Sequence, residues 1–576
     1  MMRVRLFPKL RLKYCLRKTV YRKYFLSIAL LVLQLSLAII LAQPSFSSSQ
    51  LETRYYISPS GDDSNSGITP NTPWKTIERL NQVVFKPGDQ ILFEGGATFS
   101  GNLMFDHHDQ GTDVHPIVIS SYGVGKARID AGTGTGILVY NAAGYDISNL
   151  QIFGLGVSNN TGCGISFYSD LEGNIKLDFI NIEDVEVYGF RESGISIGSW
   201  NKNSGYRKIS ITDVLTHDNG DNGLITYSQL PNTHENVYVG YVQAYNNFGI
   251  AGKRSPSGNG ILLGGVSTGT VEWSIAHDNG KFDDLEFGPV GIWAYDSTNI
   301  TIQHNESYSN RTGSPVDGDG FDLDQHTSNS VLQYNYSHDN DGAGFLLCQQ
   351  PDSREHTGNV IRYNISQNDG RKNNHGAIHV YGRVLNTEVY NNTIFVSPSS
   401  GGLPSGIRVD NWGAEDLDVS QVHFRNNIIQ TTGGISPVIV SQSQLDGARS
   451  LLFQSNNYYS TGQLLNIRWG REIYQNLSLW RNRTAQEKLH SQTLGLTVDP
   501  QLLNAGGAVA VNDPTRLDSL EAYRLAPHSP LINAGIDLQS LFSLNSGSKD
   551  FYHTSIPQST GYDIGAYEFI PTDRDK

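Results

Sequence analysis

Three features of this sequence predict an all-β fold, a parallel β-helix of about ten or more coils. Short alternating segments that open with glycine recur about every 30 residues from Gly136 to Gly406, and such a period indicates a solenoid. Each segment is followed by a second run rich in β-branched and aromatic residues, as in 300–310 and 331–340, which is typical of strands. Stripes of apolar residues at helical spacing are scarce, so a helical solenoid is disfavoured.

The first 42 residues predict export. Residues 1–24 contain nine basic residues and no acidic one, and residues 25–42 are 18 uncharged, mostly apolar residues. This order is typical of a secretory signal peptide, and the apolar run is also nearly long enough for an uncleaved signal anchor. In both cases we expect the rest of the chain, after a linker at 43–54, to be secreted, at the cell surface or in the periplasm.

The net charge restricts the class of partner. The whole chain carries −14, and without the nine basic residues of 1–24 the remainder carries −23. So acidic a protein is a poor partner for nucleic acid. We expect a monomer whose partner is a polysaccharide and which meets a membrane only through a possible N-terminal anchor.

The repeat also divides the chain. We expect a first part with an N-terminal cap and the first coils, then the β-helix core, then terminal coils with a C-terminal cap that protects the open end of the solenoid, and a short tail. These parts correspond to residues 55–135, 136–435, 436–569 and 570–576. The best helix candidate of the second half is 477–491, LSLWRNRTAQEKLHS.

Asparagine recurs at matched positions in the second run of each unit. A side-chain amide repeated in this way can bond to the units on both sides of it. We therefore predict a structural ladder, and we favour it over glycosylation although several members lie in Asn-x-Ser/Thr sequons. The members are Asn305, Asn335, Asn364, one of Asn391 and Asn392, and one of Asn426 and Asn427.

Both ends of the chain resemble a known superfamily. The segment Tyr55 to Gly101 includes TIERLNQV, a short helix candidate, and KPGDQILFEGG. It resembles the N-terminal cap of secreted right-handed parallel β-helix proteins of the pectin-lyase-like superfamily. SPLINAG (529–535) and GYDIGAYEF (561–569) are similar to a C-terminal element of the same proteins. The resemblance implies a right-handed β-helix and identifies no reaction, because the superfamily includes polysaccharide lyases, glycoside hydrolases, epimerases and non-catalytic surface proteins.

The alternation within each unit predicts which side chains face outward. If the residue after each opening glycine points inward, the inward residues are apolar, for example Phe321 and Leu323. The segment GAIHVY (376–381) fits if its register slips by one residue. Stacked coils then place eight notable side chains on one outer ridge: Trp293, Tyr295, Asp322, Asp324, His379, Tyr381, Arg408 and Asp410.

The run DGDGFDLD at 317–324 departs from the repeat because it carries acids at both outward positions. Asp322 and Asp324 would project from one strand with Cα atoms ~6.6 Å apart. That separation suits the acid and base of an inverting glycosidase and does not exclude the retaining geometry. We predict Asp322 and Asp324 as the catalytic pair, with Asp319 as a third candidate. We expect Trp293 and Tyr295 to stack on sugar rings, and we expect substrate binding by His379, Tyr381, Arg408 and Asp410.

A calcium site is a second interpretation of the same acids, because Ca²⁺ prefers oxygen ligands. Candidate ligands lie in the loop before the strand and in an earlier loop: Asp317, Asp319, Asp283, Asp284 and Glu286. The superfamily resemblance implies lyases in which Ca²⁺ bridges to a uronate and a Lys or Arg removes the C5 proton. Arg408 is the basic residue on the ridge, two to three coils away, which weakens that interpretation.

The leading hypothesis is an exported carbohydrate-active enzyme that cleaves glycosidic bonds by hydrolysis. The alternatives are a Ca²⁺-dependent polysaccharide lyase and a non-catalytic surface protein that binds glycans or neighbouring cells. A minor alternative is a uronan C5-epimerase, since GFDLDQHTSN loosely resembles the Gly-Phe-Asp-Pro-His segment of mannuronan epimerases. Leu323 replaces the proline of that segment, and His326 comes two residues later.

Overall fold

A computed structural model describes residues 52–285, 288–351, 354–413, 418–446, 450–558 and 561–571. The predicted signal or anchor at 1–42, and all but the end of the linker at 43–54, lie outside these ranges. No helix within them is long and apolar enough to span a membrane.

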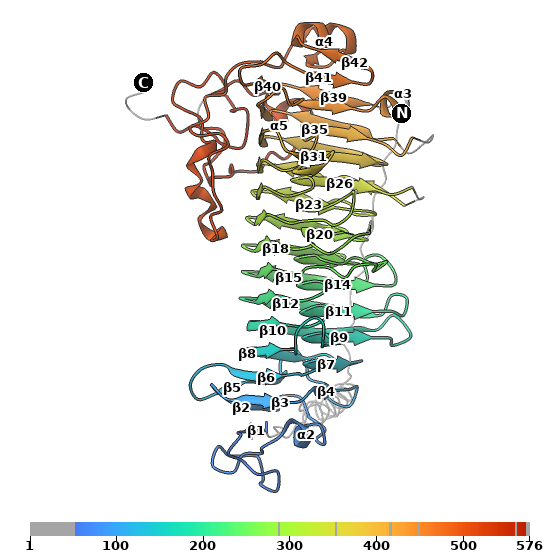
Figure 1. Ribbon diagram of the computed structural model, residues 1–576, viewed down its shortest axis with the longest axis vertical. Helices are drawn as coiled ribbons and strands as arrows, with labels where there is room; N and C mark the ends of the chain where they lie inside the picture. Colours follow the sequence, from blue (N-terminus) through green and yellow to red (C-terminus); the bar gives the residue numbers. More distant parts are fainter. Residues whose placement is uncertain are drawn as a thin grey trace, which may run out of the picture. The chain divides into compact units, whose positions relative to one another are not determined.

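The predicted right-handed parallel β-helix is confirmed (Figure 1), and it is built mainly from two long sheets. The first sheet has 14 strands, of which only the last pair, β41 and β42, is antiparallel, so it comprises about 13 coils. Its strands are β4 (Leu103–Phe105), β7 (Ile137–Tyr140), β9 (Ile165–Ser169), β11 (Ile195–Ser199), β14 (Leu224–Ser228), β17 (Ile261–Gly264), β20 (Val290–Tyr295), β23 (Asp319–Leu323), β26 (Phe345–Gln349), β31 (Gly376–Gly382), β35 (Ser405–Asp410), β38 (Val438–Val440), β41 (Ile467–Trp469) and β42 (Glu472–Tyr474).

The second sheet has 26 strands and carries the second run of each repeat. Its strands are β1 (Arg54–Ile57), β2 (Gln90–Glu94), β3 (Thr98–Ser100), β5 (Ile117–Tyr122), β6 (Ala127–Asp130), β8 (Tyr145–Phe153), β10 (Lys176–Tyr188), β12 (Gly205–Thr212), β13 (Leu215–His217), β15 (Glu235–Gly240), β16 (Gln243–Tyr245), β18 (Gly269–Glu272), β19 (Ile275–His277), β21 (Ile300–Gln303), β22 (Glu306–Tyr308), β24 (Val331–Gln333), β25 (Tyr336–His338), β27 (His356–Thr357), β28 (Val360–Arg362), β29 (Ile365–Gln367), β32 (Val384–Tyr390), β33 (Thr393–Val396), β36 (Ser420–Arg425), β37 (Ile428–Thr431), β39 (Leu451–Gln454) and β40 (Asn457–Ser460).

The remaining elements are short. The pairs β30–β34 and β43–β44 form two-stranded sheets. They and the helices have these bounds: β30 (Lys372–Asn373), β34 (Gly401–Gly402), β43 (Lys488–Leu489), β44 (Gln492–Thr493), α2 (Ile77–Leu80), α3 (Gln442–Asp446), α4 (Leu477–Thr484), α5 (Leu538–Phe542), η1 (Pro514–Ser519) and η2 (Glu521–Tyr523).

The core contains the predicted inward side chains. Phe321, Leu323 and their equivalents on neighbouring strands are fully buried. The slip of one residue in 376–381 is also confirmed, because Ile378 pairs with Phe345 and Val380 with Leu347. The inward positions therefore stack apolar side chains along the whole β-helix, and this burial is the main source of its stability.

The asparagine ladder is confirmed and runs along the inside of the turns. The Nδ2 atom of Asn335 donates to Oδ1 of Asn364 at 3.1 Å, and Asn364 donates likewise to Asn392 at 3.0 Å. Asn392 and Asn427 are thus the ladder members of their pairs. A parallel ladder that the sequence analysis did not identify runs through Asn219, Asn247, Asn279, Asn310, Asn340 and finally Asp369.

The two predicted helices are present and shorter than expected. α2 begins after Thr76, whose side chain accepts a hydrogen bond from the N–H of Arg79. α4 ends at Ala485, which adopts the left-handed conformation, so the candidate 477–491 is helical in its first half only.

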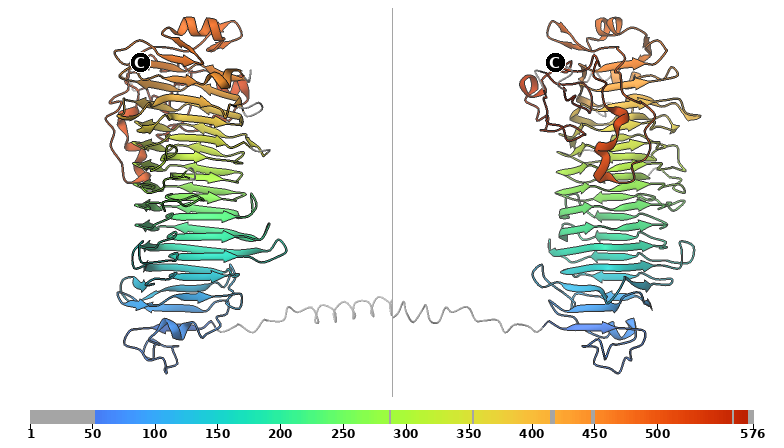
Figure 2. Two further views of the ribbon diagram at one scale, coloured as in Figure 1. Left: turned by 45° about the vertical axis from the view of Figure 1, so that its right-hand side comes forward. Right: turned by 90° about the vertical axis from the view of Figure 1, so that its left-hand side faces the viewer.

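The C-terminal segment lies elsewhere than expected. Coils continue to β42 and α4, but residues 498–569 run back along the side of the β-helix instead of covering its open end (Figures 1 and 2). Buried Glu306 accepts hydrogen bonds from the N–H groups of Val511 and Asn512, and Gln367 bonds to Ala508. Apolar residues of the segment, among them Leu517 and Tyr523, also pack against Tyr336 and Ile365 of the second sheet. The segment docks through this apolar contact and through polar side chains that satisfy its irregular backbone.

Candidate functional site

The predicted outer ridge consists of two columns of side chains on the first sheet. In one column, strand register aligns Trp293 with Asp322, Asp322 with Leu346, Leu346 with His379, and His379 with Arg408. The structure therefore brings the predicted side chains together on β20, β23, β26, β31 and β35.

The second column contains the other outward residues. Cys348 pairs with Tyr381, and Tyr381 pairs with Asp410. Asp324 follows directly after β23, and its N–H donates to the carbonyl of Ala294 at 2.9 Å, which places it beside Tyr295. Asp324 thus lies between two tyrosines of one column.

Two of the three predicted catalytic acids are buried. Asp319 and Asp322 are 0% and 3% exposed, although Asp322 is an outward residue. Asp322 thus faces outward as predicted, but it is covered and does not line an open groove. Asp319 accepts a hydrogen bond from the N–H of Ala343.

Burial determines the charge of these two carboxyls. Burial and the nearby Asp317 raise the pKa of Asp319 well above its usual value. Burial and the nearby Asp324 do the same to the pKa of Asp322. Burial therefore favours the neutral form of both carboxyls, because an isolated buried carboxylate without a cation is unfavourable.

The two remaining acids of the run reach the surface. Asp317 is half-buried, and its Oδ2 accepts a hydrogen bond from the N–H of Gly288 at 3.1 Å. Asp324 is also half-buried. Removal from water raises the pKa of Asp324 to about 6, while the N–H of Gln325 opposes this by donating to its carboxylate. A carboxyl with such a pKa can both donate and accept a proton near neutral pH.

A second charged group lies on β31 and β35. The Nε2 atom of His379 is 3.3 Å from Oδ2 of Asp410, and Nε of Arg408 donates to the same oxygen. Burial alone would raise the pKa of Asp410, but the hydrogen bond from His379 and the charge of Arg408 lower it to about 2. Arg408 and Asp410 thus form an ion pair, and His379, a third predicted substrate-binding residue, is hydrogen-bonded to it.

His375, which was not predicted from the sequence, lies between the acids of 317–324 and the group of His379, Arg408 and Asp410. It is 8% exposed, and its Nδ1 lies 4.0 Å from Oδ1 of Asp319. Its ring centroid is 5.6 Å from that of His379. Burial and the neighbouring His379 lower the pKa of His375 to about 3, so the ring is neutral. Both His375 and Asp319 directly precede an opening glycine of the repeat, and this shared position was the available signal.

The aromatic residues differ in their exposure. Trp293 is 4% exposed, packs against Leu262 and Val290, and donates from Nε1 to Oδ1 of Asn259 at 2.8 Å. It therefore cannot serve as an open stacking platform, which corrects the expectation for this residue. Tyr295 is half-buried beside it, with ring centroids 5.4 Å apart.

Tyr381 has an aromatic partner that the sequence analysis did not identify. Its ring centroid lies 4.3 Å from that of Trp412, the second residue after β35, which is 38% exposed. The Nε1 atom of Trp412 donates to the carbonyl of Gln349 at 2.7 Å. An aromatic pair therefore borders the site on the side of β31 and β35.

His326 lies at the rim of the site, beyond Asp324. It is 6% exposed, and its Nδ1 faces the carboxylate of Asp296. Arg354 also contacts Asp296, with Nη1 3.0 Å from Oδ1. His326 is thus one of a group of three side chains at the rim, with Asp296 and Arg354.

The predicted calcium ligands do not converge in the part of the chain that the structure describes. Asp283 is buried, and burial raises its pKa to about 7. Asp284 is exposed and accepts a hydrogen bond from the N–H of Gly252. Glu286 lies outside the described residues. Neither Asp317 nor Asp319 completes a cluster with them, so calcium binding stays a prediction.

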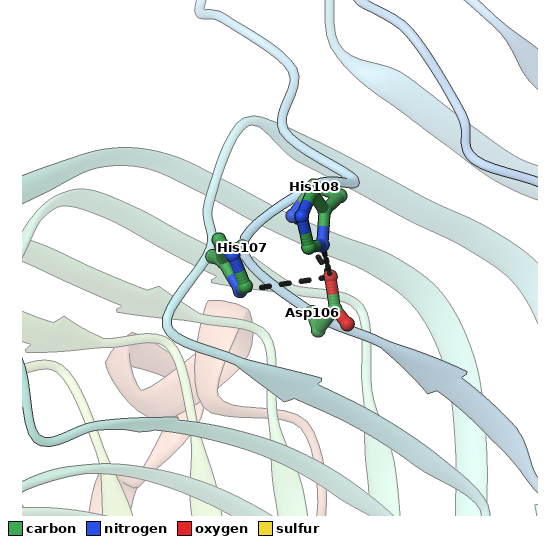
Figure 3. A group of neighbouring side chains, drawn as sticks. All are labelled: Asp106, His107 and His108. Atoms are coloured by element: carbon green, nitrogen blue, oxygen red, sulfur yellow. Dashed lines mark hydrogen bonds and ion pairs between the residues drawn. The ribbon is translucent and has the colours of Figure 1, made fainter.

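The three-residue group with metal-ligand spacing among the described residues is Asp106, His107 and His108 (Figure 3). These side chains follow β4 in a turn and are 55%, 62% and 62% exposed. Nδ1 of His108 is 2.9 Å from Oδ1 of Asp106. The group is far along the chain from the ridge, on the exposed side of this turn.

Comparison with known proteins gives distant similarities. No family model matches the chain. Lacto-N-biosidase from Bifidobacterium longum is 23% identical over 447 residues, which cover 60% of this chain and 28% of that protein. The chain thus spans little more than a quarter of the length of this relative.

Solved structures of similar proteins are also distant. The lacto-N-biosidase of family GH136 from Eubacterium ramulus has a TM-score of 0.45 at 18% identity, covering 67% of this chain and 65% of that one. Pectate lyase Pel9A has a TM-score of 0.37 at 17% identity, covering 90% and 96%. We base the fold on the strand pairings described above.

Proposed function

We propose that this protein is a carbohydrate-active enzyme that hydrolyses glycosidic bonds in a polysaccharide. The observation that carries the proposal is Asp324, a half-buried carboxyl with a pKa of about 6 between Tyr295 and Tyr381 in one column. Aromatic rings bind the C–H faces of sugars, and a tuned carboxyl can protonate a leaving oxygen. The similarity to a lacto-N-biosidase agrees with this chemistry.

In this proposal, the roles of the acids in 317–324 follow from how deeply each one is buried. Asp324 gives its proton to the glycosidic oxygen as the C–O bond breaks. Water attacks the anomeric carbon and gives its proton to a second carboxylate, which must lie about 5–10 Å from Asp324. Asp317 precedes the opposite end of β23, seven residues from Asp324, so it does not take this role. Burial disfavours the charged forms of Asp319 and Asp322, which weakens both of them as base or nucleophile.

Elimination is less well supported than hydrolysis. The base of a lyase or epimerase must reach the C5 proton, and Arg408 is the basic residue on the ridge. Arg408 lies on β35, three strands from β23, which is ~14 Å at the spacing of adjacent strands. Its guanidinium is also bound to Asp410. The sequence expectation of export is part of the proposal, since polysaccharides are outside the cell.

The test uses the full chain on neutral and uronic polysaccharides such as xylan, galactan, polygalacturonate and alginate, with calcium or with a chelator. We expect new reducing ends without an ultraviolet-absorbing unsaturated product. We expect Asp324→Asn to abolish the activity and Asp184→Asn, an exposed acid of the second sheet, to preserve it. An unsaturated product that requires calcium would show a lyase, and binding without cleavage would show a glycan-binding protein.

A further inference from the structure

Three aromatic rings near the site each pack over a glycine of the neighbouring strand that precedes it in the sheet. A Cβ atom at Gly198 would lie 2.0 Å from Cζ of Tyr227. One at Gly264 would lie 2.5 Å from Cε1 of Tyr295, and one at Gly382 would lie 2.4 Å from Nε1 of Trp412. Each ring therefore occupies the space of a side chain that the glycine lacks. Any larger residue at these glycines would lift the ring away from the sheet.

The other sheet shows how tyrosines pack when no glycine lies below them. Tyr245 stacks between His217 and His277, with centroid distances of 4.7 and 5.1 Å and ring planes within 3° of parallel. Tyr308 continues this stack at 4.8 Å from His277. Neighbouring rings cover both faces of Tyr245, so this ladder presents only ring edges. Tyr227 and Tyr295, in contrast, are separated by the strand that contributes Gly264.

The rings lie on both sides of Asp324. In the order of the first sheet, Tyr227 is on β14, three strands before β23, and Trp412 follows β35, three strands after it. Tyr295 and Tyr381 lie between these limits and Asp324. At ~4.8 Å per strand the platforms extend ~14 Å on each side of the acid.

We propose that these platforms bind one extended sugar chain along the axis of the β-helix, with sugar residues on both sides of the bond that is cleaved. The inference rests on the proposed function and specifies its substrate as the interior of a long chain. One strand spacing is similar to the length of one pyranose residue in an extended chain. Six spacings, from β14 to β35, would hold on the order of six sugar residues.

The arrangement also explains why aromatic residues are placed there. Tyrosine and tryptophan offer large, rigid surfaces that bind the C–H faces of sugars at little cost in conformational entropy. A terminal-acting enzyme needs such surfaces on one side of its acid, with the other side blocked. Here both sides carry them, and Tyr227, Tyr295 and Tyr381 are half-buried while Trp412 is exposed. The enzyme should therefore cleave internal bonds.

The first test measures the products and the length dependence of the wild-type enzyme. With the polysaccharide found in the screen, we expect a rapid fall in viscosity and early products of mixed length. With oligosaccharides of that polymer, kcat/KM should rise with chain length until about six residues and then level off. Release of a single small product from the chain end, from the first minutes onward, would overturn the inference while leaving hydrolysis intact.

The second test uses Tyr227→Ala, which removes the platform most distant from Asp324. We expect kcat/KM to fall roughly tenfold for long chains and to stay unchanged for chains too short to reach β14. Tyr245→Ala in the second sheet is the matched control and should change neither value. Equal loss for short and long chains, with unchanged thermal stability, would contradict the proposed placement.

The binding of the chain can be tested without catalysis. Affinity electrophoresis of Asp324→Asn in gels containing the polysaccharides should show retardation that Tyr227→Ala and Trp412→Ala reduce. Retardation that neither change affects would contradict the proposal that these rings bind the sugar chain. If wild type cleaves none of the polysaccharides yet is retarded through these rings, the proposed hydrolysis fails and the binding column is confirmed.

Discussion

Asp322 on β23 pairs in register with Trp293 on β20, and both outward side chains are buried. An outward position on a β-helix is therefore not always an exposed one. Leu262 and Ile225, at the same position on earlier strands, are covered as well. The ridge therefore begins with a buried apolar cluster and opens toward solvent at Asp324.

The first prediction separates the two central acids. Burial and the nearby Asp324 favour the neutral form of Asp322. Asp322→Asn should therefore fold normally and lose less than about tenfold in kcat/KM. Asp324→Asn removes the proton donor and should lose about 10²-fold or more. Reducing-end assays on the identified polysaccharide measure both, and circular dichroism verifies folding. Equal losses in the two variants would refute the division of roles.

The second prediction concerns pH. Because the pKa of Asp324 is raised to about 6, its proton-donating form decreases as the pH rises through 6. The basic limb of the profile of kcat/KM should therefore have a midpoint near pH 6, with activity falling about tenfold per unit above it. The profile applies to the free enzyme. A constant rate from pH 5 to 8 would exclude Asp324 as the acid.

The third prediction concerns the docked C-terminal segment. Glu306→Ala should leave the N–H groups of Val511 and Asn512 without their acceptor and cost about 2–4 kcal/mol of unfolding free energy. Glu306→Gln keeps one acceptor oxygen and should cost less. Urea denaturation gives the free energies, and limited proteolysis should release fragments from residues 498–569 first in the alanine variant. Exposed Glu472 on β42 provides the control, since Glu472→Ala should change neither measurement.

The fourth prediction tests the asparagine ladder. Asn335 is fully buried and bonds to Asn305, Asn364 and the carbonyl of Ile302. Asn335→Ala should therefore destabilise the protein by about 1–3 kcal/mol, because it leaves these buried groups unpaired. Asn203→Ala, at an exposed turn, should cost less than about 1 kcal/mol. Thermal unfolding compares the two, and similar shifts would argue against the ladder as a source of stability.

The sequence predicted much of the site because the repeat has a fixed side-chain alternation. It placed Asp324, Tyr381, His379, Arg408 and Asp410 on one ridge, and the strand register confirms this. It could not reveal that Asp322 is buried, because burial depends on how side chains from separate coils pack together. The flanking Trp412 was missed for the same reason, since it lies after its strand and turns back over Gly382.

The architecture of this protein could be predicted from the repeat alone: the parallel coils, the inward residues, the slip at 376–381 and the asparagine ladder. These features follow from local alternation and from a period near 30 residues, both of which are properties of the chain in order. Only the tertiary structure decided which acids are charged, which rings are open, and where residues 498–569 dock. The burial and the pKa of a side chain depend on residues from distant segments of the chain. The pattern of a single repeat therefore cannot predict them.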